Sequence, residues 1–215
     1  MPIPKIIHQT FKSKKLPWLT KWYINRQIKN NPNYSYEFYD DARILDFLNI
    51  NYDGETVDAY QKLNIGAAKA DFFRYAVLYK KGGIYVDIDS RIIGCLDNLI
   101  HEDDEAIIAN EKNPGLYVQW ALVYAPNHPF LARALQYVIK NIKENKFPND
   151  VHQMTGPTVY SKAIYDCLKE DPDVKYRNIG VDYNGNFKFK SVFSKLMYQP
   201  GEHWKKQQLI RPVLK

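Results

Sequence analysis

Two aspartates separated by one residue lie in residues 82–89, which read Gly-Gly-Ile-Tyr-Val-Asp-Ile-Asp. If this segment is extended, Asp87 and Asp89 point to one side and the apolar residues between and before them point to the other. Two carboxylates this close repel each other unless a cation or a proton lies between them. Oxygen ligands suit Mg²⁺ or Mn²⁺, whose coordination is completed by water and substrate phosphates. The spacing therefore predicts a divalent metal site that acts on a phosphorylated substrate.

The position of this Asp-x-Asp motif matters more than the motif itself. The chain has 16 aspartates, and Asp171 and Asp173 form a second such pair that suits a turn with a helix cap. The first pair instead follows the apolar run 84–88, which predicts a buried strand. Sheets in α/β proteins bind their ligands at the carboxyl ends of strands. This context favours a site at Asp87 and Asp89 over a structural pair.

A charged pair precedes the motif on a strongly apolar stretch. Residues 66–81 predict a helix that ends at the two glycines, and Asp71 and Arg74 lie on one face of it at positions i and i+3. Such a pair on an apolar helix is expected to face a cleft or to be buried with partners. The guanidinium suits hydroxyl or phosphate groups, and the carboxylate accepts hydrogen bonds from sugar hydroxyls.

The elements expected around these residues alternate between strand and helix in the first half of the chain. Strands are expected at residues 5–9, 34–39, 84–88, 106–109 and 117–124. Helices are expected at residues 17–30 with Trp18, Trp22 and Ile28 on one face, after Asp40 or Asp41, and at 66–81, 129–143 and 157–168. Asn184 and Gly185 predict a hairpin, and residues 145–156 predict a mobile loop. The pattern indicates an α/β fold.

Composition limits the class of protein. The 215 residues, of 25.3 kDa, are 45% hydrophobic and 25% charged, and they show no repeat or linker, which predicts one globular domain. Two cysteines exclude a disulfide framework and a thiolate zinc cluster. No stretch approaches the roughly 20 apolar residues that cross a bilayer, and no signal peptide is evident. We therefore expect a soluble, cytoplasmic protein without stable membrane insertion.

Positive charge is concentrated near the C-terminus. Residues 175–215 carry nine Lys or Arg and two acidic residues, whereas the whole chain has a net charge of +6. The tail could be simply solvated, or it could meet an anion such as a phosphorylated ligand or an acidic glycan. Nucleic acid is the least favoured partner, because no recognition motif accompanies the charge.

Several motifs in order resemble those of one enzyme family. Residues 3–9 (Ile-Pro-Lys-Ile-Ile-His-Gln), 70–75 (Ala-Asp-Phe-Phe-Arg-Tyr) and 82–89 together resemble the DXD-type sugar transferases of glycosyltransferase family 32 and its relatives. The resemblance covers about the first hundred residues, and residues 155–157 (Thr-Gly-Pro) match a later family element. It implies a GT-A fold, a Rossmann-like nucleotide-binding single domain with a mixed central sheet. Residues 1–100 would form the nucleotide-sugar-binding half, and residues 101–215 the acceptor half with the basic tail.

The resemblance also implies roles for individual residues. The donor-binding residues would be His8, Gln9 and Thr10 at the nucleobase or ribose, and Asp71, Arg74 and Asp87 at the sugar or ribose. Asp89 would bind Mn²⁺ or Mg²⁺ directly, with Asp87 beside it, and these two with Asp71 and Arg74 would be the catalytic residues. His203 is the candidate for a third metal ligand, and Lys206 could neutralise the diphosphate. The family's usual Trp after His-Gln is replaced here by Thr10 and Phe11.

Together these observations predict a metal-dependent transferase that moves a hexose-type sugar from a nucleotide donor, with UDP-sugar favoured, to a glycan or glycoprotein. Retention of configuration, which the family suggests, needs no base; inversion would need one, for which Asp150 and Asp182 are candidates. Two alternatives remain: a nucleotidyltransferase, and a non-catalytic module that binds nucleotides or glycans. The lack of an anchor suits a bacterial or large-DNA-virus enzyme, such as one that builds the capsid glycans of an algal virus.

Overall fold

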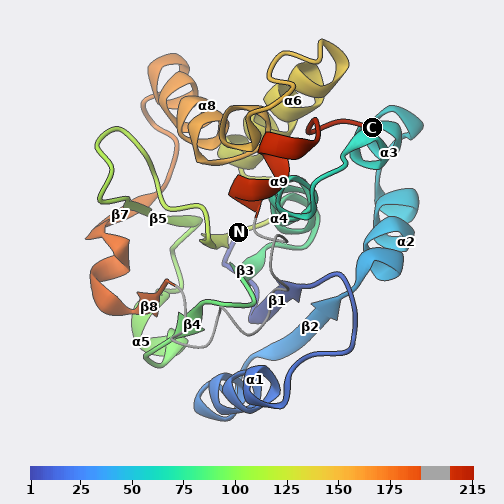
Figure 1. Ribbon diagram of the computed structural model, residues 1–215. Coiled ribbons are helices and arrows are strands. Elements are labelled where there is room, and N and C mark those ends of the chain that lie inside the picture. The colour runs from blue at the N-terminus through green and yellow to red at the C-terminus, as the bar shows by residue number, and fades with distance from the viewer. Residues whose placement is uncertain (190–203) are drawn as a thin grey trace.

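A six-stranded mixed sheet forms the centre of the computed structural model, which describes residues 1–189 and 204–215 (Figure 1). Its strands lie in the order β2–β1–β3–β6–β5–β7. They are β1 (Ile6–Thr10), β2 (Ser35–Tyr39), β3 (Gly83–Val86), β5 (Ala106–Asn110), β6 (Ala121–Tyr124) and β7 (Arg177–Val181). β1 is parallel to β2 and β3, β6 is antiparallel to β3 and β5, and β7 is parallel to β5. The predicted α/β fold with a mixed sheet is confirmed.

Helices cover both faces of the sheet (Figure 1). They are α1 (Trp18–Asn30), α2 (Asp41–Asn51), α3 (Gly54–Lys62), α4 (Gly66–Lys81), α5 (Leu96–Leu99), α6 (Pro129–Lys143), α7 (Val151–Met154), α8 (Pro157–Glu170) and α9 (Trp204–Ile210). The larger core packs α2, α3, α4, α6, α7 and α8 against one face. The smaller core lies on the other face, with α5, the two-stranded sheet of β4 (Arg91–Ile92) and β8 (Phe187–Lys188), and the turn η1 (Asp182–Gly185).

The sheet crosses the expected boundary at residue 100, because β3 pairs with β6 along four residues of each strand. Strands from both halves of the described chain therefore belong to one sheet. The assignment of a nucleotide half and an acceptor half to residues 1–100 and 101–215 stays a prediction.

The glycines after α4 let β3 start directly beside β1. Gly82 has φ +64° and ends the helix, and Gly83 has φ +100°. A Cβ atom on Gly82 would lie 2.7 Å from Pro126 Cδ, and one on Gly83 would lie 2.5 Å from the Ile6 carbonyl oxygen. Only glycine combines this backbone conformation with so little space. The chain can therefore pass from the central helix into the strand that leads to Asp87 without an intervening loop.

The two tryptophans expected on one face of α1 lie on its exposed side. Trp18 and Trp22 are 77% and 47% exposed, and the helix buries Thr20, Ile24 and Gln27. The Gln27 side chain helps to explain this orientation, because its Oε1 accepts a 2.8 Å hydrogen bond from the Ile92 amide of β4. Burial of this amide satisfies a strand backbone group that would otherwise lack a partner.

The predicted hairpin at Asn184 and Gly185 was also wrong. β7 pairs with β5, and β8 pairs with β4, so the two flanking segments do not pair with each other. The turn between them is set by Tyr183, which is fully buried and donates a 2.8 Å hydrogen bond to the Ala121 carbonyl. Burial of this side chain fixes the local backbone, which a turn signature in sequence does not reveal.

Two other segments differ from the expectation. Residues 145–156 contain α7, whose Val151 and Met154 are buried, so this segment is held to the core. The expected strand 117–124 is regular only from Ala121.

Near the C-terminus, Val213 is buried and its amide and carbonyl bond to Pro148 and Asn64, so this part of the basic tail packs on the body. Within the described ranges, no helix has both the length and the apolar character needed to cross a membrane.

A buried histidine makes the stability of the fold depend on pH. His128 caps α6 with Nδ1 accepting from the Phe130 amide at 3.3 Å, and its Nε2 donates to the Lys175 carbonyl at 3.1 Å. Burial lowers its pKa to about 4, because the neutral ring alone suits these partners. The unfolded chain therefore binds the proton first as pH falls. We expect about 3 kcal/mol of unfolding free energy to be lost between pH 6.5 and 4.

Urea unfolding of wild type and His128→Asn across this pH range checks the prediction. Asparagine can still cap the helix but does not titrate, so the variant should lose less stability on acidification. Equal losses in the two proteins would show that His128 is not the source.

Candidate functional site

The two aspartates of the motif lie in a turn rather than on a strand. β3 ends at Val86, and the Ser90 amide donates to the Asp87 carbonyl at 2.8 Å to close the turn. Ile88, expected to continue the strand, packs instead against Ile24 of α1. The prediction that Asp87 and Asp89 lie on an extended strand was therefore wrong. The turn still follows the carboxyl end of a central parallel strand, where ligands of α/β sheets bind.

Arg74 connects three segments at this turn. Its Nη2 lies 2.8 Å from Asp87 Oδ1 and 3.2 Å from Asp71 Oδ1, and its Nη1 donates to the Gln119 carbonyl at 2.6 Å. The Arg74 side chain is only 5% exposed. The structure thus brings together Asp71, Arg74 and Asp87, as the sequence predicted, and buries the pair on α4 with partners.

Asp71 is held by polar side chains from the second half of the chain. Gln119 Nε2 donates to its Oδ1 at 3.0 Å, and Thr155 Oγ1 donates to its Oδ2 at 2.8 Å. Sequence reasoning assigned no role to Gln119, and it did not connect Thr155 with Asp71. The signal for Gln119 was an amide inside an apolar run, and that for Thr155 was its place in the Thr-Gly-Pro element.

Two tyrosines complete this network. The Tyr85 hydroxyl donates to Asp87 Oδ1 at 3.1 Å, and the Arg74 guanidinium lies 4.8 Å from the Tyr85 ring centre. The Tyr75 hydroxyl accepts from Gln119 Nε2 at 2.7 Å and donates to the Thr155 carbonyl at 3.0 Å. These bonds fix the orientation of Asp87, whose side chain remains 24% exposed.

Several carboxylates lie close together at this site. Burial, together with Asp89 and Asp71, raises the pKa of Asp87 to about 7, although Arg74 opposes the shift. Burial also raises the pKa of Asp71. Asp71 and Asp87 share the Arg74 guanidinium. Within the described part of the chain, the buried Ser90 hydroxyl next to Asp89 has no hydrogen-bond partner. Clustered carboxylates beside an unsatisfied hydroxyl form a donor set that fits Mg²⁺ or Mn²⁺.

The residues expected at the nucleobase are buried at the end of β1. Gln9 Nε2 donates to the Val86 and Asp87 carbonyls at 3.2 and 3.3 Å, and Thr10 Oγ1 donates to the Tyr39 carbonyl at 2.9 Å. His8 is fully buried, its Nε2 lies 3.0 Å from the Gly82 carbonyl, and burial lowers its pKa to about 4. Of these side chains, Gln9 supports the segment that carries Asp87. Their contact with a nucleotide stays a prediction.

The basic tail contributes one described residue of the expected site. Lys206 is exposed on α9, and its contact with a diphosphate stays a prediction. His203, the expected third metal ligand, lies outside the described residues.

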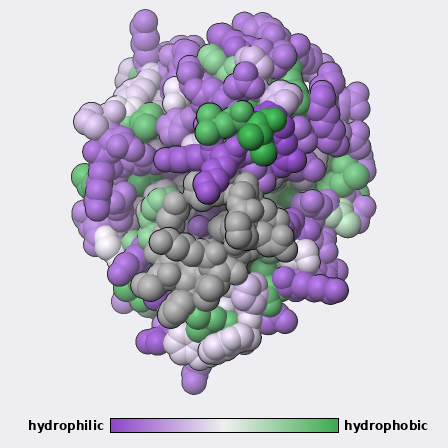
Figure 2. Space-filling model, in the orientation of Figure 1, coloured by the Kyte–Doolittle hydropathy of each residue, from purple (hydrophilic) through white to green (hydrophobic). Residues whose placement is uncertain are grey.

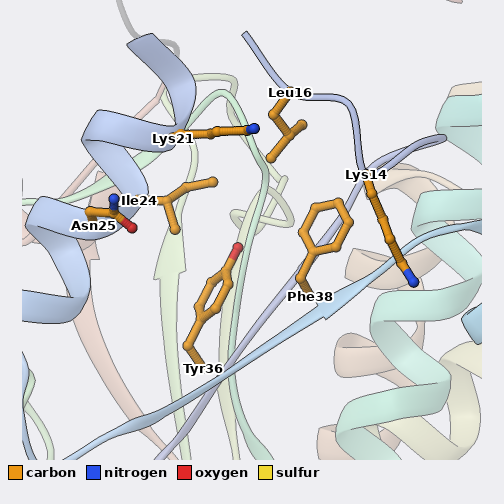
Figure 3. Close-up of a pocket in the computed structure, with 7 residues that line it drawn as sticks. All are labelled: Lys14, Leu16, Lys21, Ile24, Asn25, Tyr36 and Phe38. Carbon is orange, nitrogen blue, oxygen red and sulfur yellow. The ribbon is translucent and has the colours of Figure 1, made fainter. Parts of the chain in front are cut away.

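A pocket of about 260 Å³ lies behind the motif, between α1 and β2 (Figure 3). Tyr36 and Phe38 rise into it from β2, and Ile24 of α1, which also packs on Ile88, faces them. Lys14 and Lys21 are its charged lining residues. The Tyr36 hydroxyl donates to Gln9 Oε1 at 3.1 Å, so one side chain connects this pocket with the strand end at Asp87.

A second cluster of possible metal ligands lies away from the motif, and protein contacts account for its arrangement. His101, Asp103 and Asp104 place one ligand atom each within 4.8 Å of one another. However, Arg177 binds both carboxylate oxygens of Asp104, and the His101 amide donates to Asp104 Oδ2 at 2.8 Å. Protein groups thus already neutralise the Asp104 carboxylate.

Comparisons of sequence identify relatives. The profile of a glycosyltransferase sugar-binding region containing a DXD motif matches residues 17–106. An uncharacterized glycosyltransferase of Acanthamoeba polyphaga mimivirus is 32% identical over 175 residues, which cover 79% of this chain and 68% of that protein. Inositol phosphoceramide mannosyltransferase 3 of Schizosaccharomyces pombe is 30% identical over 179 residues, which cover 80% of this chain and 48% of that protein. The chain thus spans about two thirds of the viral relative and half of the fungal one.

Comparisons of structure support the fold. The PaToxG glycosyltransferase superposes with a TM-score of 0.62 at 20% identity, covering 80% of this chain and 70% of that one. The UDP-bound glycosyltransferase domain of the YGT toxin superposes with a TM-score of 0.56 at 9% identity, covering 82% and 79%. The fold is that of these toxin domains, in agreement with the expected GT-A architecture.

The burial of Arg74 makes its replacement costly for stability. Arg74→Lys keeps the charge but cannot reach Asp87, Asp71 and the Gln119 carbonyl together, so buried groups lose partners. We expect the free energy of unfolding in urea to fall by about 3 kcal/mol. Arg133→Lys, which alters the exposed pair between α6 and Glu170, is the matched control and should change stability far less. Equal effects would contradict a central role for Arg74.

Proposed function

The chain belongs to the glycosyltransferase family defined by a sugar-binding region with a DXD motif, and we propose that its own site transfers a hexose from a nucleoside diphosphate sugar. The observation that carries this proposal is the buried network of Asp71, Arg74 and Asp87 next to Asp89. It combines groups for sugar hydroxyls with clustered carboxylates for a cation.

Asp89 and Asp87 would hold the divalent metal, with Mn²⁺ or Mg²⁺ matching their oxygen ligands. When bound, such an ion neutralises charge that develops on a leaving diphosphate. His203 and Lys206 are proposed as further groups on the tail side, the first as a ligand and the second as a cation for the phosphates. Ser90 adds an unsatisfied buried hydroxyl to this donor set.

Asp87 has one oxygen oriented by the protein and one for the ligand. Among described residues, both hydrogen bonds to its carboxylate, from Arg74 and Tyr85, end on Oδ1. We therefore assign Oδ2 to a ribose or sugar hydroxyl. Asp71 and Arg74 would bind sugar hydroxyls at their small exposed surface, and His8, Gln9 and Thr10 would place the end of β1 at the nucleobase.

The structure gives the two candidate bases other roles, which supports a mechanism with retention of configuration. Asp150 accepts from the Gln153 amide at 3.0 Å and caps α7. Asp182 lies 3.7 Å from Lys112 Nζ. A retaining transfer needs no carboxylate to deprotonate the acceptor, so the site would need only to bind the donor and stabilise the diphosphate.

Two observations bear on the donor, and they concern different parts of it. A toxin domain of the same fold was solved with UDP bound, which supports a uridine nucleotide. The fungal relatives are named mannosyltransferases, which supports mannose as the sugar. A glycan or glycoprotein is proposed as acceptor, in the cytoplasm. Testing requires a panel in which UDP and GDP each carry several hexoses.

Calorimetric titration of the purified chain with this panel, with and without Mn²⁺, tests the proposal. We expect one donor to bind only with the metal. Asp89→Asn should weaken that binding at least a hundredfold, because one coordinating charge is lost. Asp173→Asn, in the second Asp-x-Asp pair, is the matched control and should bind like wild type.

Three outcomes of this titration, and of a product analysis with the donor that binds, would count against the proposal. Metal-independent binding that survives Asp89→Asn would remove the motif from the site. Binding of a donor without sugar transfer or donor hydrolysis would indicate a binding module. Incorporation of a nucleoside monophosphate into product would indicate nucleotidyl transfer.

A further inference from the structure

The N-terminal part of the chain is basic to an unusual degree. Between Met1 and Tyr36 it has seven Lys or Arg and no Asp or Glu. Six of these residues lie on α1 or in the loop that precedes it, and all six are exposed: Lys12, Lys14, Lys15, Lys21, Arg26 and Lys29. We call this area, together with Trp18 and Trp22, the α1 surface.

Two indole rings project from the same surface. Trp18 and Trp22 are one helical turn apart, so they occupy neighbouring positions on the outer face of α1. The Arg26 guanidinium lies 5.5 Å from the Trp22 ring centre. Large exposed aromatic side chains beside basic residues mark interaction sites, and this combination is typical of protein at a membrane–water interface.

Three basic residues of the α1 surface have no ion-pair partner among the described residues. Within residues 1–189 and 204–215, no ion pair joins Lys15, Arg26 or Lys29 to a carboxylate. Lys14 lies 3.6 Å from Asp40 but its side chain is 78% exposed. A partner for this surface must therefore supply negative charge.

The pocket between α1 and β2 opens at this surface and has apolar walls (Figure 3). Leu16, Ile24 and Phe38 line it, while Lys14 and Lys21 supply its charges. Apolar walls with ammonium groups suit an anionic amphiphile better than a nucleic acid, whose bases need hydrogen-bonding partners for their edges. The ligand chemistry indicated is therefore a phosphate group attached to an apolar part.

We propose that the α1 surface binds the face of a bilayer that contains anionic phospholipids. The indoles lie at the interface, the lysines and arginine meet lipid phosphates, and the pocket receives apolar parts of a lipid. Because the buried Ile24 packs against Ile88 of the motif, α1 would lie between the bilayer and the Asp87–Asp89 turn. The binding itself does not depend on sugar transfer.

Sedimentation of the full chain with vesicles tests this inference. The vesicles are of phosphatidylcholine alone or with one third phosphatidylserine. We expect binding to the anionic vesicles only, and weaker binding as salt is added. Lys15→Gln/Arg26→Gln/Lys29→Gln should lower the partition coefficient about a hundredfold, at about fivefold for each charge. Lys140→Gln/Lys143→Gln/Lys169→Gln, on α6 and α8, is the matched control and should bind like wild type.

The tryptophans provide a second, independent readout. Brominated lipid should quench the fluorescence of the bound chain, and Trp18→Ser/Trp22→Ser should lose most of this quenching and bind roughly tenfold more weakly. Leu209→Ser/Ile210→Ser removes two residues that are each 81% exposed on α9, and it should retain both properties. Circular dichroism confirms that each variant is folded before it is compared.

Three results would overturn the inference: equal binding to both kinds of vesicle, loss of binding in the α9 or α6/α8 variants instead, or displacement of vesicles by RNA that the chain binds more tightly. Asp89→Asn should bind vesicles like wild type, and the α1 variants should bind soluble donor like wild type. These controls separate failure of membrane binding from failure of the proposed transferase function.

Discussion

The site depends on one buried guanidinium, that of Arg74. It bonds Asp71 on its own helix, Asp87 after β3, and the carbonyl of Gln119 before β6, so three segments of the chain meet at one side chain. A buried charge is tolerated only when hydrogen-bonding and charged partners replace water. The surrounding Gln119, Thr155 and tyrosine contacts satisfy this requirement. The network therefore stabilises the fold and also holds Asp87 in place.

The same network gathers the acidic side chains that the proposed metal site requires. Arg74 pairs with Asp71 and Asp87, and burial together with the nearby Asp89 and Asp71 raises the pKa of Asp87 to about 7. At Asp104, by contrast, Arg177 binds both carboxylate oxygens. We propose that a divalent cation and the hydroxyls of a sugar bind at the clustered carboxylates of the motif. Gly82 and Gly83 let the chain pass directly from α4 into β3, and the turn at the far end of this strand brings Asp87 to Arg74 of α4.

The sequence predicted the parts of this structure that depend on local patterns. The bounds of α4 and α6 followed from apolar periodicity and from the glycines and prolines at their ends, and the Asp71–Arg74 spacing predicted a shared face. What the sequence did not predict depends on contacts between distant segments. Gln27 bonds to β4 and so leaves the tryptophans of α1 facing outward. The buried Tyr183 side chain anchors a turn where a hairpin was expected. Gln119 and Thr155 bond to Asp71 from 48 and 84 residues away. The periodicity of a sequence gives no signal for contacts between residues so far apart.

The central claim is that the Asp87–Asp89 turn, oriented by Arg74, is the metal and donor site. A crystal structure with Mn²⁺ and a nucleoside diphosphate tests it most directly, because anomalous scattering locates the metal without assumptions about the ligand. We predict one strong peak within coordination distance of the Asp89 carboxylate, with the diphosphate on the same ion. A peak at His101, Asp103 and Asp104, with none at Asp89, would contradict the account.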